Sequence, residues 1–233
     1  MNTKLTRSGE TLKELFMSLK EPRDVANLLE VEYSRLIYHI HKYPESKKYT
    51  TFTISKRNGE VREIRSPISP IKILQKKLNV ILQHVYTPKP SVYSFIPNRS
   101  ILDNAKQHLG RKYVFNLDLK DFFPSIHFGR VRGMFIGKPY NLPPSVATIL
   151  AQICCWEGVL PQGAPTSPII SNMICARMDS ELQKLARECR CTYTRYADDI
   201  TFSTNRSNFP EEIATVNNLG QLEAVSKLHE QKI

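Results

Sequence analysis

Acidic residues in two separate segments are the first candidates for chemistry. Asp198 and Asp199 are neighbours between two apolar stretches, where a tight turn is expected, and Asp118 closes an apolar stretch further upstream. Neighbouring carboxylates repel one another, and a divalent cation would relieve the repulsion because hard cations prefer carboxylate oxygens. If both segments lie in one sheet, the three acids form a site for two Mg²⁺ ions, as used in nucleotidyl transfer. The simpler alternative for Asp198 and Asp199 is a solvated turn, where Asp is common.

A loop rich in Pro and Gly is the second candidate. Residues 160–168, LPQGAPTSP, contain three prolines and one glycine directly before a predicted helix. Such a loop fixes an unusual backbone, and the helix N-terminus that follows can face phosphate or sugar. The alternative is a rigid loop that only leads the chain into the helix.

The elements that must position these residues are an antiparallel sheet and several helices. Predicted strands cover residues 113–119, 192–196 and 200–204, the last two meeting at Ala197-Asp198-Asp199. Predicted helices begin at Pro124-Ser125, at Pro144 and at Ser167-Pro168, and residues 210–233 are helical in propensity. This order of elements is typical of an α+β fold in which helices cover one side of an antiparallel sheet.

The first half of the chain is predicted to be helical with one hairpin. Amphipathic spacing indicates helices over residues 11–19, through Leu28, Leu29 and Leu36, and from Ser69-Pro70 onward. Between them the period changes to two, because residues 49–55 and 61–64 flank Asn58-Gly59. This dipeptide is a strong signal for a tight hairpin turn.

The composition indicates a folded, basic protein. Its 233 residues include 33 Lys and Arg against 22 Asp and Glu, a net charge of +11, with 41% hydrophobic residues. These values exclude disorder, collagen and coiled coil. No apolar run approaches the roughly 18–20 residues of a membrane span, and the N-terminus lacks the apolar core of a signal peptide. We therefore expect a soluble, cytoplasmic protein whose five cysteines, which lack zinc-site spacing, are free thiols.

Part of the positive charge is concentrated between residues 47 and 77. Glu60 and Glu63 are the only acidic residues in this stretch, against nine basic residues: Lys47, Lys48, Lys56, Arg57, Arg62, Arg65, Lys72, Lys76 and Lys77. Such a cluster is typical of a surface that meets phosphates. The alternative is a basic protein that binds no nucleic acid.

Three sequence blocks point to a family. NLDLKDFFPSI, LPQGAPTSPIISN and TRYADDITFS occur in the order and spacing of reverse transcriptase motifs, and from about Tyr49 onward the chain resembles a bacterial reverse transcriptase. Residues 104–108, NAKQH, fit the N-A-x-x-H element of retron reverse transcriptases, and SFIPNRSI just before them is similar to the retron pattern. FGRVRG, TRYADDITFSTN and FPEEIATV resemble retron enzymes associated with a toprim-type nuclease.

The resemblance implies a right-hand polymerase fold. It divides the chain into an N-terminal helical extension (1–48), fingers with a retron-specific region (49–112) and a palm (113–233) with an antiparallel sheet backed by helices. The family's thumb, primer grip and V-T-G element have no counterpart before Ile233. The expectation is therefore a chain of fingers and palm that stops before the thumb.

The resemblance also assigns roles to residues. Asp118, Asp198 and Asp199 would be catalytic and would hold two Mg²⁺ ions, or Mn²⁺, together with the Leu119 carbonyl. Phe123 would reject a ribose 2′-hydroxyl, with core packing as the alternative. The other expected nucleotide-binding residues are Gln162, Gly163 and Arg62. Arg62 would grip the triphosphate, and a solvated strand charge is its alternative.

Three residues would meet RNA or primer. Asn104 and His108 would recognise structured RNA, or else order a loop and satisfy a hydrogen bond in the core. Tyr196 would contact the primer end or pack beneath it.

The implied function is an RNA-directed DNA polymerase that uses dNTPs. It would copy part of a cognate non-coding RNA into branched, RNA-linked single-stranded DNA, and serve with a toprim or nuclease effector in defence against phage. Two alternatives remain: another bacterial reverse transcriptase, intron-derived or of the abortive-infection type, and a non-catalytic RNA-binding scaffold for an effector.

Overall fold

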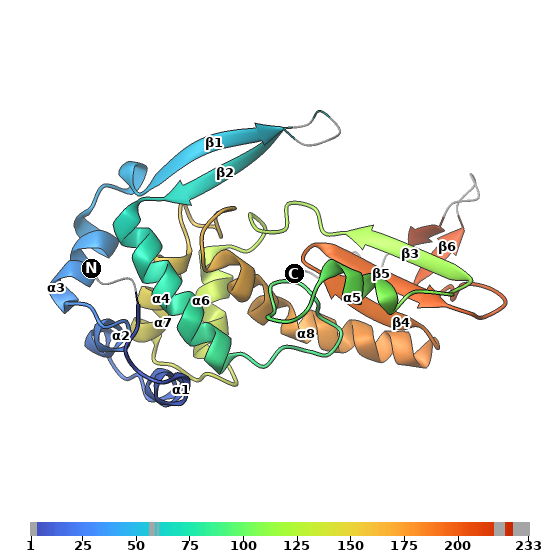
Figure 1. Ribbon diagram of the computed structural model, residues 1–233, viewed down its shortest axis with the longest axis horizontal. Helices are drawn as coiled ribbons and strands as arrows, with labels where there is room; N and C mark the ends of the chain where they lie inside the picture. Colours follow the sequence, from blue (N-terminus) through green and yellow to red (C-terminus); the bar gives the residue numbers. More distant parts are fainter. Residues whose placement is uncertain (1–3, 56–58, 60, 217–221, 226–233) are drawn as a thin grey trace. The chain divides into compact units, whose positions relative to one another are not determined.

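The computed structural model describes residues 4–55, 59, 61–216 and 222–225 (Figure 1). Contacts divide the chain into two compact units, each drawn from two stretches of sequence. Unit 1 comprises Met1–Thr87 and Phe123–Met173, and unit 2 comprises Pro88–Phe122 and Ile174–Ile233. The units therefore interleave along the chain.

Unit 1 is a helical assembly with one hairpin. Its helices are α1 (Gly9–Met17), α2 (Pro22–Leu28), α3 (Tyr33–Ile37), η1 (Tyr38–Lys42), η2 (Glu45–Lys47), α4 (Ser69–Val85), α6 (Phe128–Ile136), α7 (Pro144–Cys154) and the beginning of α8 (Ser167–Glu188). Local sequence explains the helix starts: Ser8 Oγ accepts from the Thr11 amide at the start of α1, and Pro residues open α2, α4 and α7. In the core, the Phe16 ring lies 6.1 Å from those of Phe135 and Tyr140.

The hairpin of unit 1 pairs β1 (Tyr49–Ser55) with β2 (Val61–Pro67), antiparallel from Tyr49↔Pro67 to Ser55↔Val61. Figure 1 shows it extending away from the helices of its own unit. The predicted turn at Asn58-Gly59 lies outside the described residues except for Gly59, whose φ is +85°. Only Tyr49 of β1 is buried, stacked on Trp156 at 4.8 Å.

One helix of unit 1 begins later than predicted. The proline at position 124 suggested a start at Pro124-Ser125, but α6 begins at Phe128. The backbone of the preceding residues is used for pairing instead: His127 bridges Val159, and the Leu160 amide donates to the Ile126 carbonyl at 3.0 Å. Those hydrogen bonds replace the first helical turn.

Unit 2 is built on a three-stranded antiparallel sheet of order β3-β5-β4. Its strands are β3 (Tyr113–Asp118), β4 (Thr192–Tyr196) and β5 (Asp199–Thr204), as predicted within a residue. The helix α5 (Ile101–Lys106), the remainder of α8 and a small hairpin of β6 (Ala214–Val216) with β7 (Leu222–Ala224) complete the unit. The helical prediction for residues 210–233 is therefore wrong where the structure describes them.

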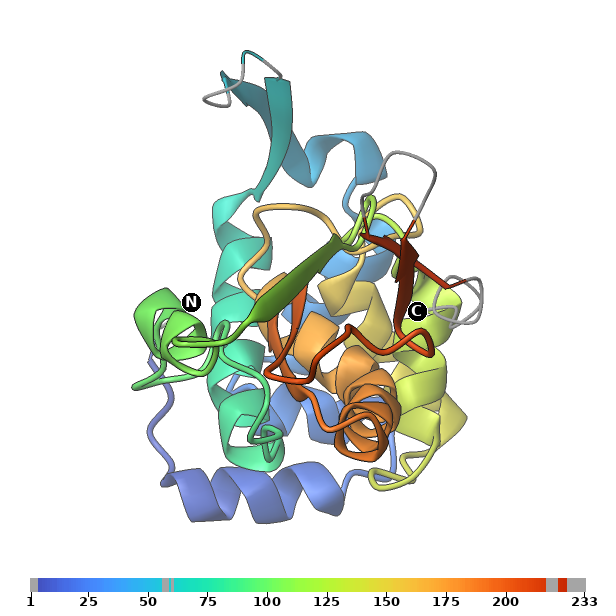
Figure 2. The same cartoon turned by 90° about the vertical axis from the view of Figure 1, so that its right-hand side faces the viewer.

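The sheet is covered by α8 on one face and in part by a second segment on the other face, where Val114 of β3 remains 48% exposed. Side chains alternate along a strand, so Tyr193 and Arg195 share a face, and both bond to Asp179 of α8. Thr194 points the other way and bonds to His108, which follows α5. Figure 2 shows α5 and α8 as separate layers of unit 2. The mixed α+β class is as expected, but the segment with α5 and His108 on the second face of the sheet was not predicted.

Two expectations from composition can be compared with the structure. No helix among the described residues is long and apolar enough to cross a membrane. All five cysteines are free thiols, as predicted. Burial raises the pKa of Cys155 to about 12, so that this thiol is a poor nucleophile near neutral pH.

Candidate functional site

The two acidic segments meet at one end of the sheet of unit 2. Asp118, the last residue of β3, lies opposite Asp199, the first residue of β5, in antiparallel register. The Leu119 amide donates a 3.0 Å hydrogen bond to the Asp198 carbonyl, which fastens the turn to the end of β3. The expectation that these acids share one sheet is confirmed, whereas their catalytic role stays a prediction.

Strand alternation shows which face carries the acids. Asn116 and Thr201 lie opposite each other two residues below the Asp118–Asp199 pair, and their side chains bond at 2.9 Å. Side chains two residues apart share a face, so the two aspartates project on this same side. Tyr196 is opposite Asp199 in β4 and joins them there, half-buried. We call this side of the sheet the polar face.

Electrostatics of the polar face disfavour three ionised carboxylates. Burial, followed by the charges of Asp198 and Asp118, raises the pKa of Asp199 above its ordinary value. Like charges directly opposite in a sheet are destabilising, and a cation would remove that cost. The donors are hard oxygens, the type that Mg²⁺ prefers. Within the described ranges, no three His, Cys, Asp or Glu side chains converge closely enough to hold a metal ion. The acids are therefore neighbours whose oxygen atoms suit a divalent cation, although their side chains do not converge on one point.

The turn between β4 and β5 has an unusual backbone. Only Ala197 and Asp198 separate the paired residues Tyr196 and Asp199, and Ala197 has a φ of +57°. Two-residue hairpins with a positive φ at the first position normally place Gly there. Ala197 is held instead from both sides: its amide donates to Ser94 Oγ at 2.7 Å, and its carbonyl accepts from Arg195 Nη1 at 2.9 Å.

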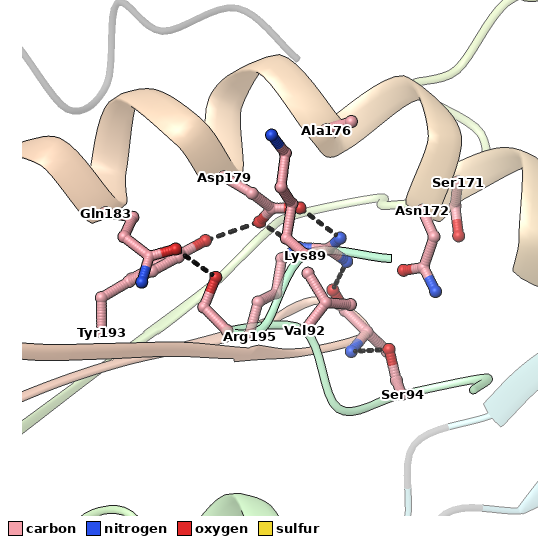
Figure 3. Close-up of polar contacts among 12 residues, drawn as sticks. Lys89, Val92, Ser94, Ser171, Asn172, Ala176, Asp179, Gln183, Tyr193 and Arg195 are labelled. Carbon is pink, nitrogen blue, oxygen red and sulfur yellow. Dashed lines mark hydrogen bonds and ion pairs between the residues drawn. The ribbon is translucent and has the colours of Figure 1, made fainter. Parts of the chain in front are cut away.

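Arg195 belongs to a buried polar network behind the turn (Figure 3). Its Nε and Nη2 atoms donate to the two carboxylate oxygens of Asp179 at 2.7 and 2.8 Å, and the Tyr193 hydroxyl donates to the same carboxylate at 2.7 Å. Neither charged side chain has any exposed surface. Burial opposes the charge of Arg195, but the hydrogen bonds to Asp179 and the charges of the acidic groups around the guanidinium together outweigh burial and raise the pKa of Arg195.

Sequence reasoning missed this network, although two signals were present. Arg195 is two residues after Tyr193 and shares its face of β4, and Asp179 falls on the apolar side of α8, four residues after Cys175. A charged residue at a core position needs a partner. Two such positions of opposite sign therefore indicate a buried pair.

In unit 1, the loop at residues 160–168 is fixed to the second strand of the hairpin. The Arg65 amide donates to the Gln162 carbonyl at 2.8 Å. Gly163 has a φ of +119°, and a Cβ at this position would lie 2.9 Å from Ile64 Cγ2 and 3.0 Å from the Arg65 carbonyl oxygen. Ser167 Oγ donates to the Pro161 carbonyl at 2.7 Å. Glycine is therefore required by this contact, whatever the loop binds.

The basic cluster of unit 1 is only partly a surface. Lys48 Nζ donates to the Ile40 carbonyl, and Lys77 Nζ donates to the Leu29 carbonyl at 2.9 Å, both from buried positions. Arg65 forms ion pairs with Glu63 and Glu157. These three residues have structural partners, so the number of charges in the cluster overstates what is free to meet phosphates.

The remaining predicted nucleotide-binding residues lie in unit 1. Arg62 is in β2 opposite Ile54, and its side chain lies outside what the structure describes. Phe123 is half-buried in the turn region after β3, whereas its neighbour Phe122, in unit 2, is almost completely buried at 4% exposure. Core packing thus accounts for Phe122, and the role of Phe123 stays a prediction.

The predicted RNA-binding residues lie in unit 2, where His108 has structural partners. Its Nδ1 is 2.6 Å from Ser203 Oγ and its Nε2 is 2.7 Å from Thr194 Oγ1, which ties the segment after α5 to the polar face. This geometry favours the core hydrogen-bond alternative for His108. Asn104 differs, because its Oδ1 is buried with no hydrogen-bond partner among the described residues.

The chain thus has acids at one end of an antiparallel sheet and, between these acids in the sequence, a Pro-Gly loop with a fixed backbone. These features can be compared with those of known protein families. The family of reverse transcriptases (RNA-dependent DNA polymerases) matches residues 47–232, and the chain belongs to this family.

Within that family the chain is similar to retron enzymes. It is 42% identical to the retron Mx65 reverse transcriptase of Myxococcus xanthus over 200 residues, which are 77% of this chain and 46% of that relative. It is 36% identical to the retron Ec86 reverse transcriptase of Escherichia coli over 180 residues, 76% of this chain and 54% of that relative. The family match confirms the predicted family, and these similarities support its predicted retron type. The chain spans about half the length of these curated relatives.

Proposed function

We propose that the protein is an RNA-directed DNA polymerase of the retron type. The observation that carries the proposal is the register of the polar face, where Asp118 lies opposite Asp199 and Asp198 is bonded to Leu119. In a chain of this family, that arrangement gives three carboxylates at one sheet end a purpose that a solvated turn does not have. We assign residues 113–233, with the β3-β5-β4 sheet, to a polymerase palm and residues 49–112, with the β1-β2 hairpin, to the fingers and a retron-specific region, after an N-terminal helical extension of residues 1–48.

Asp118, Asp198 and the Leu119 carbonyl would hold Mg²⁺, with Asp199 in support. When bound, two such ions activate the attacking hydroxyl and stabilise the leaving oxygen. The chain's own residues do the rest: Arg62 grips the triphosphate, Gln162 and Gly163 line the incoming nucleotide, and Phe123 excludes a 2′-hydroxyl. Tyr196 lies on the polar face opposite Asp199 and, in this proposal, would meet the primer end.

The nucleic acid partner in this proposal is a cognate non-coding RNA, part of which is copied into branched, RNA-linked single-stranded DNA. Asn104 is the better candidate for RNA contact in the segment after Ser100, because both ring nitrogens of His108 are engaged within the fold. A toprim or nuclease effector acting in defence against phage completes the proposal.

Sequencing the nucleic acid that copurifies with the full-length protein tests the type of polymerase. A branched molecule, in which DNA is joined to an internal RNA 2′-hydroxyl, is the expected product. Intron RNA, or DNA without an RNA template, would assign the protein to another group of bacterial reverse transcriptases. Tight RNA binding without incorporation of labelled dNTP would point to a non-catalytic scaffold.

A further inference from the structure

The turn that carries Asp198 is held by two side chains, Ser94 and Arg195, which bond to its backbone. Ala197 has a positive φ without being glycine, and both of its backbone polar groups are bonded to buried side chains, Ser94 Oγ and Arg195 Nη1. Ser94 and Arg195 are each 0% exposed. A conformation of this kind persists only where its surroundings over-determine it, and such residues cluster at active sites.

Both supports are themselves anchored. Arg195 is oriented by the two-point contact of its Nε and Nη2 with Asp179, so that Nη1 is directed to the Ala197 carbonyl (Figure 3). Ser94 lies in a segment that runs parallel to β4: Val92 bridges Arg195, and the Tyr93 amide donates to the Arg195 carbonyl at 2.9 Å. The turn is thus held by Ser94 and by Arg195, which Asp179 of α8 orients.

We propose that Arg195 and Ser94 are positioning residues that hold the Ala197 turn so that Asp198 points at the reacting centre. The inference rests on the proposed function, because it gives the orientation of Asp198 a catalytic meaning. Neither residue touches substrate in this account. They act through the backbone of Ala197, and Asp179 acts through Arg195.

The shape of the guanidinium group explains why position 195 is an arginine. A planar guanidinium can bind a carboxylate with two nitrogens while a third N–H reaches another acceptor, whereas lysine offers one nitrogen. Arg195→Lys therefore keeps a positive charge for the buried Asp179 but cannot keep this geometry and the bond to Ala197 together. Replacing Arg195 with a neutral residue is a poorer test, because it leaves Asp179 buried and uncompensated.

Ser94→Ala is the main experiment, since it removes one oxygen from the turn and leaves the buried ion pair intact. Ser91→Ala is the matched control: Ser91 is also buried and lies in the same segment, but its hydroxyl donates to Gln183 and not to the turn. Mg²⁺-dependent incorporation of dNTP by the full-length protein is measured for both variants, for Arg195→Lys and for Asp198→Ala, together with thermal unfolding.

We expect Ser94→Ala and Arg195→Lys to lower kcat by roughly 10- to 100-fold, as small misplacements of catalytic groups do, with KM for dNTP changed less than twofold. Ser91→Ala should keep the wild-type kcat. Equal kcat values for Ser94→Ala and Ser91→Ala, with Asp198→Ala inactive, would overturn the inference alone. Wild-type activity of Asp198→Ala would overturn the proposed function instead. If Arg195→Lys does not fold, the comparison of kcat between Ser94→Ala and Ser91→Ala tests the inference.

Discussion

At the scale of single residues, the acidic end of the sheet carries an electrostatic cost to folding stability. Asp199 lies opposite Asp118 and next to Asp198, and burial together with these two charges raises its pKa. The folded protein therefore holds the Asp199 proton more tightly than the unfolded chain does. Ionisation of Asp199 lowers folding stability as the pH rises through and above its ordinary pKa of 3.8.

Asp199→Asn should consequently raise the melting temperature at pH 7, because the variant removes one of three repelling charges. The gain should shrink as the pH is lowered and disappear below pH 3.8, where the wild-type side chain becomes protonated in the unfolded chain too. Calorimetry across this pH range measures the effect, with Glu211→Gln, an exposed acid of the same unit, as the control. A melting temperature that falls at pH 7 would contradict this electrostatic account.

A second residue-scale prediction concerns Gly163. Its positive φ and the 3.0 Å approach of a Cβ to the Arg65 carbonyl oxygen predict that Gly163→Ala costs about 1–3 kcal/mol of folding free energy. Gly133 in α6 is the counter-example, because nothing lies within 4 Å of its Cβ position. Gly133→Ala should stabilise unit 1 by about 0.5–1 kcal/mol. Chemical denaturation of the two variants should give changes of opposite sign.

At the scale of elements, the sequence predicted those whose signal is contained in their own residues. The strands β3, β4 and β5 follow from apolar periodicity, and the starts of α4, α7 and α8 follow from Pro residues at the beginning of amphipathic stretches. The late start of α6 could not be predicted, because the residues before it pair with a distant segment around Val159. The β6–β7 pairing overrode a helical propensity in a different way, because these two strands pair with each other as a local hairpin. At the site, the acidic residues could be predicted from their residue types and spacing. The Arg195–Asp179 ion pair could not, because it depends on the packing of α8 against β4.

The segment after α5 contributes an element-scale pH dependence through His108. Burial, followed by the charge of Arg111, lowers the pKa of His108. The unfolded chain then takes up the proton at a higher pH than the folded one, so stability should fall as the pH decreases below about 6.5.

His108→Asn should remove this component of the pH dependence while lowering stability at pH 7.5, where two hydrogen bonds are lost. Denaturation at pH 7.5 and 5.5 measures the difference. His41→Asn, at an exposed position in unit 1, serves as the control. An unchanged pH slope in His108→Asn would show that other groups cause it.

At the scale of the whole molecule, the net charge of +11 does not translate directly into a binding surface. Lys76 and Lys77 are neighbours in α4, yet Lys76 is exposed whereas Lys77 is 1% exposed and donates to the Leu29 and Glu30 carbonyls. Burial lowers the pKa of Lys77, which is consistent with a structural role. Position in the fold, not the number of charges, decides which lysines can meet RNA.

The two lysines make a matched pair for this claim. Lys76→Gln should weaken RNA binding and reduce the slope of log K against log salt by about 1, without changing stability. Lys77→Met should lower stability by about 1.5–3 kcal/mol, since its hydrogen bonds are charged, and leave the salt slope unchanged. RNA binding at several salt concentrations and denaturant unfolding measure both. The reverse pattern would contradict the assignment.

The central claim is that the acids of the polar face perform nucleotidyl transfer. Incorporation of labelled dNTP by the full-length protein with its copurified RNA and Mg²⁺ tests this claim most directly, comparing wild type with Asp118→Asn and Asp198→Asn. Loss of several kcal/mol of transition-state stabilisation corresponds to a rate decrease of about a thousandfold. We predict that decrease for both variants, with folding and RNA binding retained. Incorporation at the wild-type rate by either variant would contradict the account.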